Sequence, residues 1–151
     1  MAEIGPGALL GVDFGSVRIG VAACDAERIL AFPVETVPAG DQALTRLVEL
    51  ADQYQVVAMI VGWPLTLAGQ VAAAAARVQS QAEELSASVS VPVWLVDERL
   101  TTAEAAKKLR QAGKDARRGR AVIDGGAAVG ILDSVMRALA AGQRIGRRVG
   151  R

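Results

Sequence analysis

Acidic side chains occupy positions in this 151-residue sequence where a core residue is expected. Asp13 lies within one apolar run, Glu98 follows directly on another, and Asp124 precedes an alanine-rich segment. A charge at the edge of a core is costly unless it is paired or binds a metal. Asp13 and Glu98 also lie at the carboxyl ends of their predicted strands. In open α/β sheets, ligands gather beyond these ends. These three carboxylates are therefore the candidate catalytic and metal-binding residues.

Helical spacing decides which carboxylate of the last predicted helix joins the other two. At 100° per residue, Asp124 shares a face with the apolar residues Ala128, Ile131 and Val135. Asp133 lies half a turn away from Asp124 and is expected to face solvent. Asp124 is therefore the better candidate.

The absence of histidine narrows the possible chemistry. It excludes Ser-His-Asp and Cys-His nucleophile systems and His-ligated zinc. The single cysteine excludes an intrachain disulfide and a cysteine cluster that could hold zinc or iron–sulfur. Three carboxylates make an all-oxygen site, which suits Mg²⁺ or Mn²⁺. A pair of such ions can hydrolyse a phosphodiester, so the residues point to metal-dependent phosphodiester hydrolysis.

The net charge of +1 hides two halves of opposite sign. Residues 1–98 carry four basic and twelve acidic side chains, whereas residues 99–151 carry thirteen basic and four acidic ones. This asymmetry predicts a polyanionic partner at the basic half. The residues expected to follow its backbone are Lys107, Lys108, Arg110, Lys114, Arg117, Arg118 and Arg120. We find no targeting segment and no apolar run that could span a membrane, and we expect a cytoplasmic protein.

Local structural roles remain open for the same carboxylates. Asp13 is also compatible with a turn position, and Asp124 with a helix N-cap. Asp97 and Glu98 both precede a predicted helix, whose N-terminus either could cap or charge. For Asp97 we favour this capping role over a place in the site.

Hydrophobic periodicity predicts a single α/β domain with the element order βββαβαβαα, in which the five strands form a mixed sheet flanked by helices. A Gly-Ser turn joins the first two strands in an antiparallel hairpin. Residues 1–7 are expected to be a loose leader, 113–120 a basic loop and 142–151 a disordered basic tail. The expected strands cover residues 8–14, 17–24, 29–37, 56–62 and 91–96, and the expected helices cover 41–54, 71–85, 102–112 and 124–141.

Four motifs give the chain a family resemblance over roughly residues 8–141. They are GVDFGSVRIGVA (11–22), VGWPL (61–65), DERLTT (97–102) and IDGGAAVGIL (123–132). Together they resemble the YqgF/RuvX family of RNase H-like nucleases. The sequence departs from the family pattern at Ala68, where an Asn or Asp is frequent, so a polar group is missing from that loop.

The resemblance implies an RNase H-like fold and places metal-binding carboxylates at Asp13, Glu98 and Asp124. It implies a nuclease that processes the 5′ end of precursor 16S ribosomal RNA or, alternatively, a Holliday junction resolvase. The expected partner is accordingly structured RNA or branched DNA, and dimers are known in the family. A resolvase needs two sites and hence a dimer. The neighbours expected to contact substrate are Gly15, Ser16, Arg18 and Arg99.

Two other functions remain compatible with the sequence. The Asp-x-Gly pattern after a first strand also occurs in actin-like and sugar-kinase ATPases, but those proteins need two such lobes and this length allows one. A non-catalytic RNA-binding factor in ribosome assembly would use the basic half equally well. Loss of function on replacing Asp13 or Glu98 discriminates catalysis from this second alternative.

Overall fold

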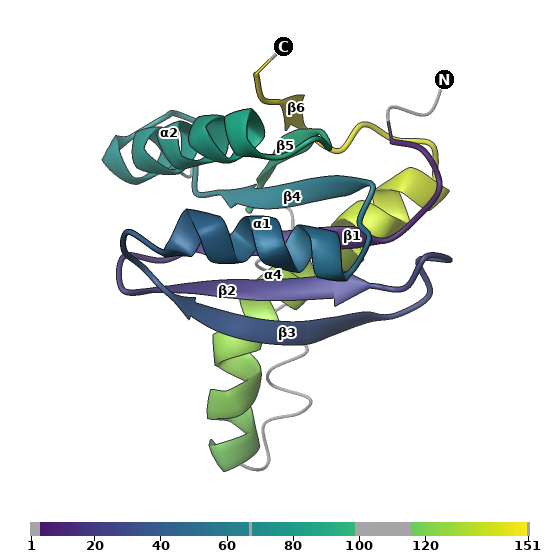
Figure 1. Ribbon diagram of the computed structural model, residues 1–151, viewed down its shortest axis with the longest axis horizontal. Helices are drawn as coiled ribbons and strands as arrows, with labels where there is room; N and C mark the ends of the chain where they lie inside the picture. The colour runs from purple at the N-terminus through teal and green to yellow at the C-terminus, as the bar shows by residue number, and fades with distance from the viewer. Residues whose placement is uncertain (1–3, 67, 99–115, 151) are drawn as a thin grey trace.

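The computed structural model describes residues 4–66, 68–98 and 116–150, and within its last helix it describes side chains from residue 126 onward. Six strands and three helices alternate along these residues (Figure 1). They are β1 (Leu9–Phe14), β2 (Arg18–Cys24), β3 (Ala31–Pro38), α1 (Ala43–Gln53), β4 (Ala58–Trp63), α2 (Ala73–Ser88), β5 (Val93–Asp97), α4 (Ala116–Ala140) and β6 (Arg147–Arg148).

All six strands form one mixed sheet in the order β3-β2-β1-β4-β5-β6. The β1–β2 and β2–β3 pairs are antiparallel, which confirms the predicted hairpin. The β1–β4 and β4–β5 pairs are parallel, as expected for strands joined through helices. The predicted mixed sheet is therefore confirmed, with six strands in place of five.

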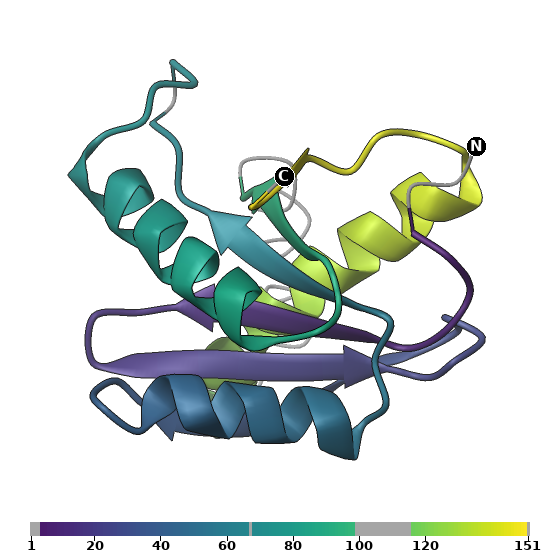
Figure 2. The same ribbon diagram turned by 45° about the horizontal axis from the view of Figure 1, so that its top comes forward.

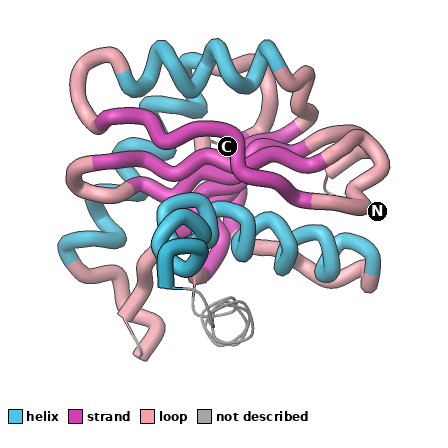
Figure 3. Tube along the Cα trace, turned by 90° about the horizontal axis from the view of Figure 1, so that it is seen from below, coloured by secondary structure: helices cyan, strands magenta, loops and turns pink. Residues whose placement is uncertain are grey.

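Helices cover both faces of the sheet (Figures 2 and 3). One apolar cluster joins α1 and α2 to side chains such as Val12 and Val61. A second cluster joins α4 to the opposite face, where Leu9 and Ile60 lie. The two faces of β1 and β4 are thus both buried, which explains why these strands are continuous apolar runs.

The last helix begins earlier than the sequence predicts. Helix α4 starts at Ala116, so residues 116–120 are helical and do not form the expected basic loop. Alanine and arginine are strong helix formers, and here they outweigh the glycines within the segment. The helix predicted over residues 102–112 lies outside the described residues.

The C-terminal segment is also ordered where a disordered tail was predicted. Its strand β6 pairs antiparallel with β5, and the flanking residues Ile145 and Val149 are buried. The backbone N–H of Val149 donates to the Val93 carbonyl at 2.8 Å. Two apolar side chains among the arginines are enough to fix this segment against the sheet.

Residues 4–7, which were predicted to belong to a loose leader, are also held against the fold. Ile4 is buried, and Arg28 Nε donates to the Gly7 carbonyl at 2.8 Å, so residues 4–7 are fastened to the β2–β3 turn.

The Cys24 side chain is buried, and its Sγ accepts a hydrogen bond from Leu9 N at 3.3 Å. Burial raises the pKa of the Cys24 thiol. Among the described residues, no helix is long and apolar enough to cross a bilayer.

Candidate active site

The carboxyl ends of β1, β4 and β5 meet at one edge of the sheet. Because β1 and β4 are parallel and Val12 is opposite Val61, Asp13 lies level with Gly62. Gly62 is in turn opposite Val96 on β5, and Glu98 is the first residue after that strand's last position. The topology therefore brings two of the predicted carboxylates to neighbouring strand ends.

Strand alternation places both carboxylates on the face covered by α4. Gly11 on β1 faces Leu132 of α4, and Asp13 is two residues further along the same strand. On β5, Val96 belongs to the α4-side cluster, and Glu98 is two residues beyond it. Asp97 has the opposite parity and lies on the α2 side. This geometry resolves the ambiguity between the two neighbouring acids in favour of Glu98.

A glycine makes room for the Glu98 side chain. The Glu98 backbone N–H donates to the Trp63 carbonyl at 3.2 Å, which turns the chain back over the end of β4. A Cβ placed on Gly62 would lie 2.7 Å from Glu98 Oε1 and 3.1 Å from its Cγ. Real Cβ atoms essentially never approach another atom to within 3.0 Å. The missing side chain of Gly62 therefore forms the slot in which the Glu98 carboxylate lies.

Asp13 and Glu98 are hydrogen-bonded to each other. The pKa of Glu98 rises to about 7, first because of burial, then through the hydrogen bond and charge of Asp13, and last through the charge of Asp97. A hydrogen bond between two carboxyl groups requires a proton on one of them. Near neutral pH the pair is thus poised between holding a proton and holding a cation.

The donor set fits a hard divalent ion. Both groups offer only oxygen atoms. Burial is the main cause of the raised Glu98 pKa, and a cation between the two carboxylates would offset the charge repulsion that adds to it. Among the side chains that the structure describes, no group of three or more potential ligands converges. The side chain of Asp124, the predicted third ligand, lies outside the described set.

The position of Asp124 along α4 is consistent with that role. Asp124 is one helical turn before Ala128 and two turns before Ile131, both of which are buried against the sheet. Ile131 is also the α4 residue whose Cδ1 a Cβ on Gly62 would meet. The spacing keeps Asp124 as the predicted third carboxylate.

Comparison with known proteins agrees with the motifs. Residues 7–138 match the sequence profile of RuvX, which is described as a Holliday junction resolvase. The chain belongs to the RuvX family. Three relatives, each described as "Putative pre-16S rRNA nuclease", come from Cutibacterium acnes, Streptomyces coelicolor and Mycobacterium ulcerans. They are 45%, 47% and 46% identical to this chain, cover 91%, 86% and 94% of it, and are themselves covered over 86%, 80% and 87%.

The fold of this RuvX-family chain is similar to that of solved RuvC structures. A structure described as "T. thermophilus RuvC in complex with Holliday junction substrate" superposes with a TM-score of 0.55. The match covers 95% of this chain and 99% of that one at 15% identity. A second RuvC structure gives a TM-score of 0.53 at 14% identity. These similarities confirm the predicted RNase H-like fold.

The β1–β2 turn carries the other predicted neighbours to the same edge. Gly15 N donates to the Arg18 carbonyl at 2.9 Å, and a Cβ on Gly15 would run into that carbonyl oxygen. The turn itself thus requires a glycine at this position. Ser16 and Arg18 are exposed on either side of the turn tip, three and five residues after Asp13.

The side chains of most of the basic residues predicted to contact the substrate lie outside the described set. Arg99, Lys107, Lys108, Arg110 and Lys114 lie outside the described residues. The backbones of Arg117, Arg118 and Arg120 belong to α4, so these residues follow one another along a helix. Their role toward a nucleic acid stays a prediction.

Sequence reasoning missed the part that β4 plays in this RuvX-family site. Trp63 accepts the Glu98 N–H through its carbonyl, and its indole Nε1 donates to the Ala75 carbonyl of α2 at 3.1 Å. Gly62 provides the slot for Glu98. A glycine inside a buried strand signals close approach of another group, and this was the available clue.

The prediction that Asp133 faces solvent was wrong, because its side chain is half-buried.

Proposed function

We propose that this protein is a metal-dependent endonuclease that processes the 5′ end of precursor 16S rRNA. The observation that carries the proposal is the half-buried Asp13–Glu98 pair at the ends of parallel strands, with the pKa of Glu98 raised to about 7. Carboxylates held together in this way are a common basis for nucleolytic metal sites. The relatives described as "Putative pre-16S rRNA nuclease" support the choice of substrate.

In the proposed mechanism, Asp13, Glu98 and Asp124 would together hold the divalent ions. When bound there, Mg²⁺ or Mn²⁺ would activate a water molecule for attack on the phosphodiester and would neutralise charge on the leaving oxygen. Glu98 must give up its proton before it can act as a ligand, so its raised pKa links occupancy of the site to pH. The slot at Gly62 and the bond to the Trp63 carbonyl hold Glu98 toward Asp13.

The remaining residues of the proposed site bind and orient the substrate. Ser16 and Arg18 extend from the turn beside Asp13, and Arg99 follows directly on Glu98. Contacts of this kind to phosphate oxygens position a nucleic acid but carry no sequence information. The basic residues from Lys107 to Arg120 would extend such contacts along the backbone. A ribosomal RNA precursor as substrate implies a cytoplasmic site of action.

Resolution of four-way DNA junctions is the second candidate. The family's description as a Holliday junction resolvase and the likeness of the fold to RuvC favour it. Symmetric cleavage of a junction requires two sites and therefore a homodimer. Cleavage specificity separates the two candidates.

The test compares cleavage of a precursor 16S leader with cleavage of a four-way DNA junction, each with Mg²⁺ and with Mn²⁺. We expect cleavage of the leader near the mature 5′ end. We also expect a loss of at least roughly 100-fold in Asp13→Asn, Glu98→Gln and Asp124→Asn, because each removes a ligand. Symmetric cleavage of the junction with an intact leader would establish the resolvase. Tight binding of the leader without cleavage by either metal would establish a non-catalytic assembly factor.

A further inference from the structure

The C-terminal segment forms an exposed edge of arginines beside β5. Arg147 and Arg148 are the two residues of β6, and Arg144 shortly precedes them in the chain. All three are exposed. We call these three residues the arginine edge. Nothing in the mechanism above uses them.

The segment is built into the fold by groups other than its arginines. Ile145 and Val149 are buried, and Val149 N donates to the Val93 carbonyl at 2.8 Å. At Gly146 the backbone passes so close to the Leu95 carbonyl that a Cβ would run into it. Apolar burial and backbone pairing therefore hold the strand, and the guanidinium groups remain available.

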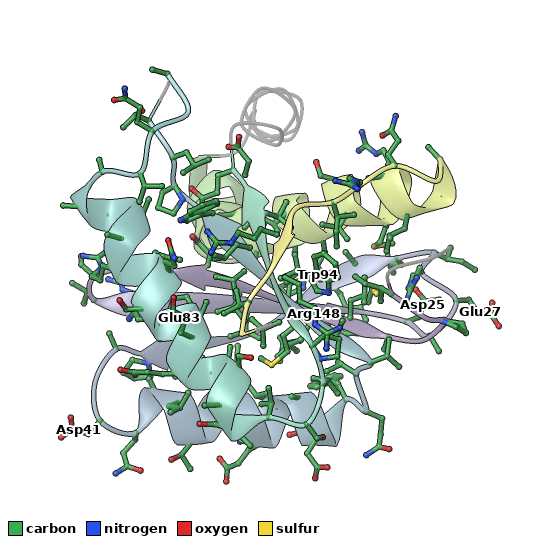
Figure 4. All side chains as sticks on the ribbon, turned by 90° about the horizontal axis from the view of Figure 1, so that it is seen from above. Asp25, Glu27, Asp41, Glu83, Trp94 and Arg148 are labelled. Atoms are coloured by element: carbon green, nitrogen blue, oxygen red, sulfur yellow. The ribbon has the colours of Figure 1, made fainter. Side chains whose placement is uncertain are left out.

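No acidic partner neutralises the arginine edge within the part of the chain that the structure describes. None of its guanidinium groups makes an ion pair or hydrogen bond there. Glu83 lines a 250 Å³ hollow together with Arg148, but no ion pair joins them. Figure 4 shows Asp25 and Glu27 at the right-hand side of the molecule, to one side of Arg148.

The arginine edge lies next to the strand that delivers Glu98. Arg147 is opposite Leu95, which is two residues before the end of β5, a distance of roughly 7 Å along the strand. Adjacent strands are about 4.8 Å apart, so β6 is one strand spacing beyond β5. A nucleic-acid strand carries one negative charge per roughly 3.4 Å of helix axis. A backbone with one phosphate in the site therefore has further phosphates within reach of this edge.

We infer that Arg144, Arg147 and Arg148 bind the sugar–phosphate backbone of the RNA substrate along the outer side of β5. The inference depends on the proposed function for the choice of RNA as the polyanion, and not on hydrolysis. Guanidinium groups suit this role because they form paired hydrogen bonds with phosphate oxygens. The resulting interactions would supply affinity and salt dependence without sequence preference.

The experiment measures binding of a fluorescent precursor 16S leader between about 50 and 200 mM salt, in EDTA so that no cleavage occurs. It compares wild type with a variant that carries Arg144→Gln, Arg147→Gln and Arg148→Gln, and with the three single variants. Matching Arg→Lys substitutions keep the charge. Arg77→Gln removes an exposed positive charge from α2, away from the arginine edge.

Removing one arginine–phosphate interaction is expected to make the slope of log affinity against log salt shallower by about 0.7–0.9. The triple Gln variant should therefore have a slope shallower by roughly two units or more, with a raised KM and an unchanged kcat. The Lys variant should keep the wild-type slope, and Arg77→Gln should change it little. Thermal melting checks that β6 remains in place.

Two results would overturn the inference. One is a triple Gln variant with wild-type affinity and slope. The other is a Lys variant that loses as much affinity as the Gln variant, because shape and not charge would then be responsible. Wild-type protein that binds the leader through the arginine edge but never cleaves it would refute the proposed nuclease and leave the inference intact. Cleavage of the leader by the triple Gln variant with an unchanged KM would refute the inference and leave the proposed nuclease intact.

Discussion

Replacing Gly62 with alanine tests how the fold aims Glu98. The added Cβ would lie 2.7 Å from Glu98 Oε1, whereas ordinary van der Waals distances begin near 3.4 Å. The carboxylate must then move by about 0.7 Å, away from its present place beside Asp13. Misplacement of a reacting group by about 1 Å can lower the rate roughly 100-fold. We expect Gly62→Ala to lower kcat by roughly 10- to 100-fold and to weaken Mn²⁺ binding.

The same Cβ also meets Ile131 Cδ1 on α4, so a loss of stability must be separated from the displacement of the Glu98 carboxylate. Overpacking a core typically costs about 1–3 kcal/mol. Adding Ile131→Val removes that methyl group and leaves Glu98 untouched. The Gly62→Ala, Ile131→Val protein should regain stability in urea denaturation while its kcat and its Mn²⁺ affinity by calorimetry stay low.

A double-mutant cycle with Glu98→Asp completes the test. In the wild-type background, Glu98→Asp shortens the side chain and withdraws it from Asp13. In the Gly62→Ala background the carboxylate is already displaced, so the same change should cost much less. The idea that Gly62 makes room for the Glu98 carboxylate would be refuted by strictly additive effects on kcat. Recovery of full activity through Ile131→Val alone would also refute it, because Gly62 would then matter only for packing against α4.

Three further predictions concern neighbouring groups. Asp97→Asn should keep most of the cleavage activity in a leader assay, because its side chain lies on the opposite face of the sheet from Glu98. Trp63→Phe should cost roughly 1 kcal/mol in urea denaturation, because it removes the indole bond to the Ala75 carbonyl and keeps the backbone bond to Glu98. In EDTA, the melting temperature should fall as pH rises from about 4.5 to about 7, because folded Glu98 holds its proton more tightly than the unfolded chain does. Glu98→Gln should remove that fall, and Mg²⁺ should stabilise wild type more at a pH above the Glu98 pKa than at a pH below it; an identical pH profile in both proteins would contradict the raised pKa.

Regular features of this fold could be predicted from the sequence because their signals are local. The apolar residues at helical spacing in 71–85 predicted the buried face of α2, and Ala75, Val78, Ala82 and Leu85 are buried. Val71 precedes the helix and is exposed, so the pattern ran on beyond the element. The Gly-Ser turn likewise predicted the β1–β2 hairpin because its geometry depends on neighbouring residues alone.

Features that depend on distant parts of the chain could not be predicted in this way. Strand β6 has two arginines and no periodicity, and it exists because the edge of β5 is open to pair with it. Asp97 and Glu98 are equivalent as sequence neighbours, and only the parity of β5 against α4 separates them. The role of Gly62 requires knowing that Glu98 folds back over β4. The chemistry proposed for the site thus follows from residue types, whereas the orientation of its carboxylates depends on how neighbouring strands pack.

The single buried thiol of Cys24 gives this protein an intrinsic reporter of structural opening. It is the last residue of β2 and its sulfur accepts a bond from Leu9 N, at the first residue of β1. A thiol-specific reagent can reach it only when these strands separate, so its labelling rate measures the free energy of that opening without any engineered probe. A metal ion or RNA that binds only the folded form slows labelling in proportion to its occupancy. The affinity of each ligand can therefore be read from the native chain by following one sulfur atom.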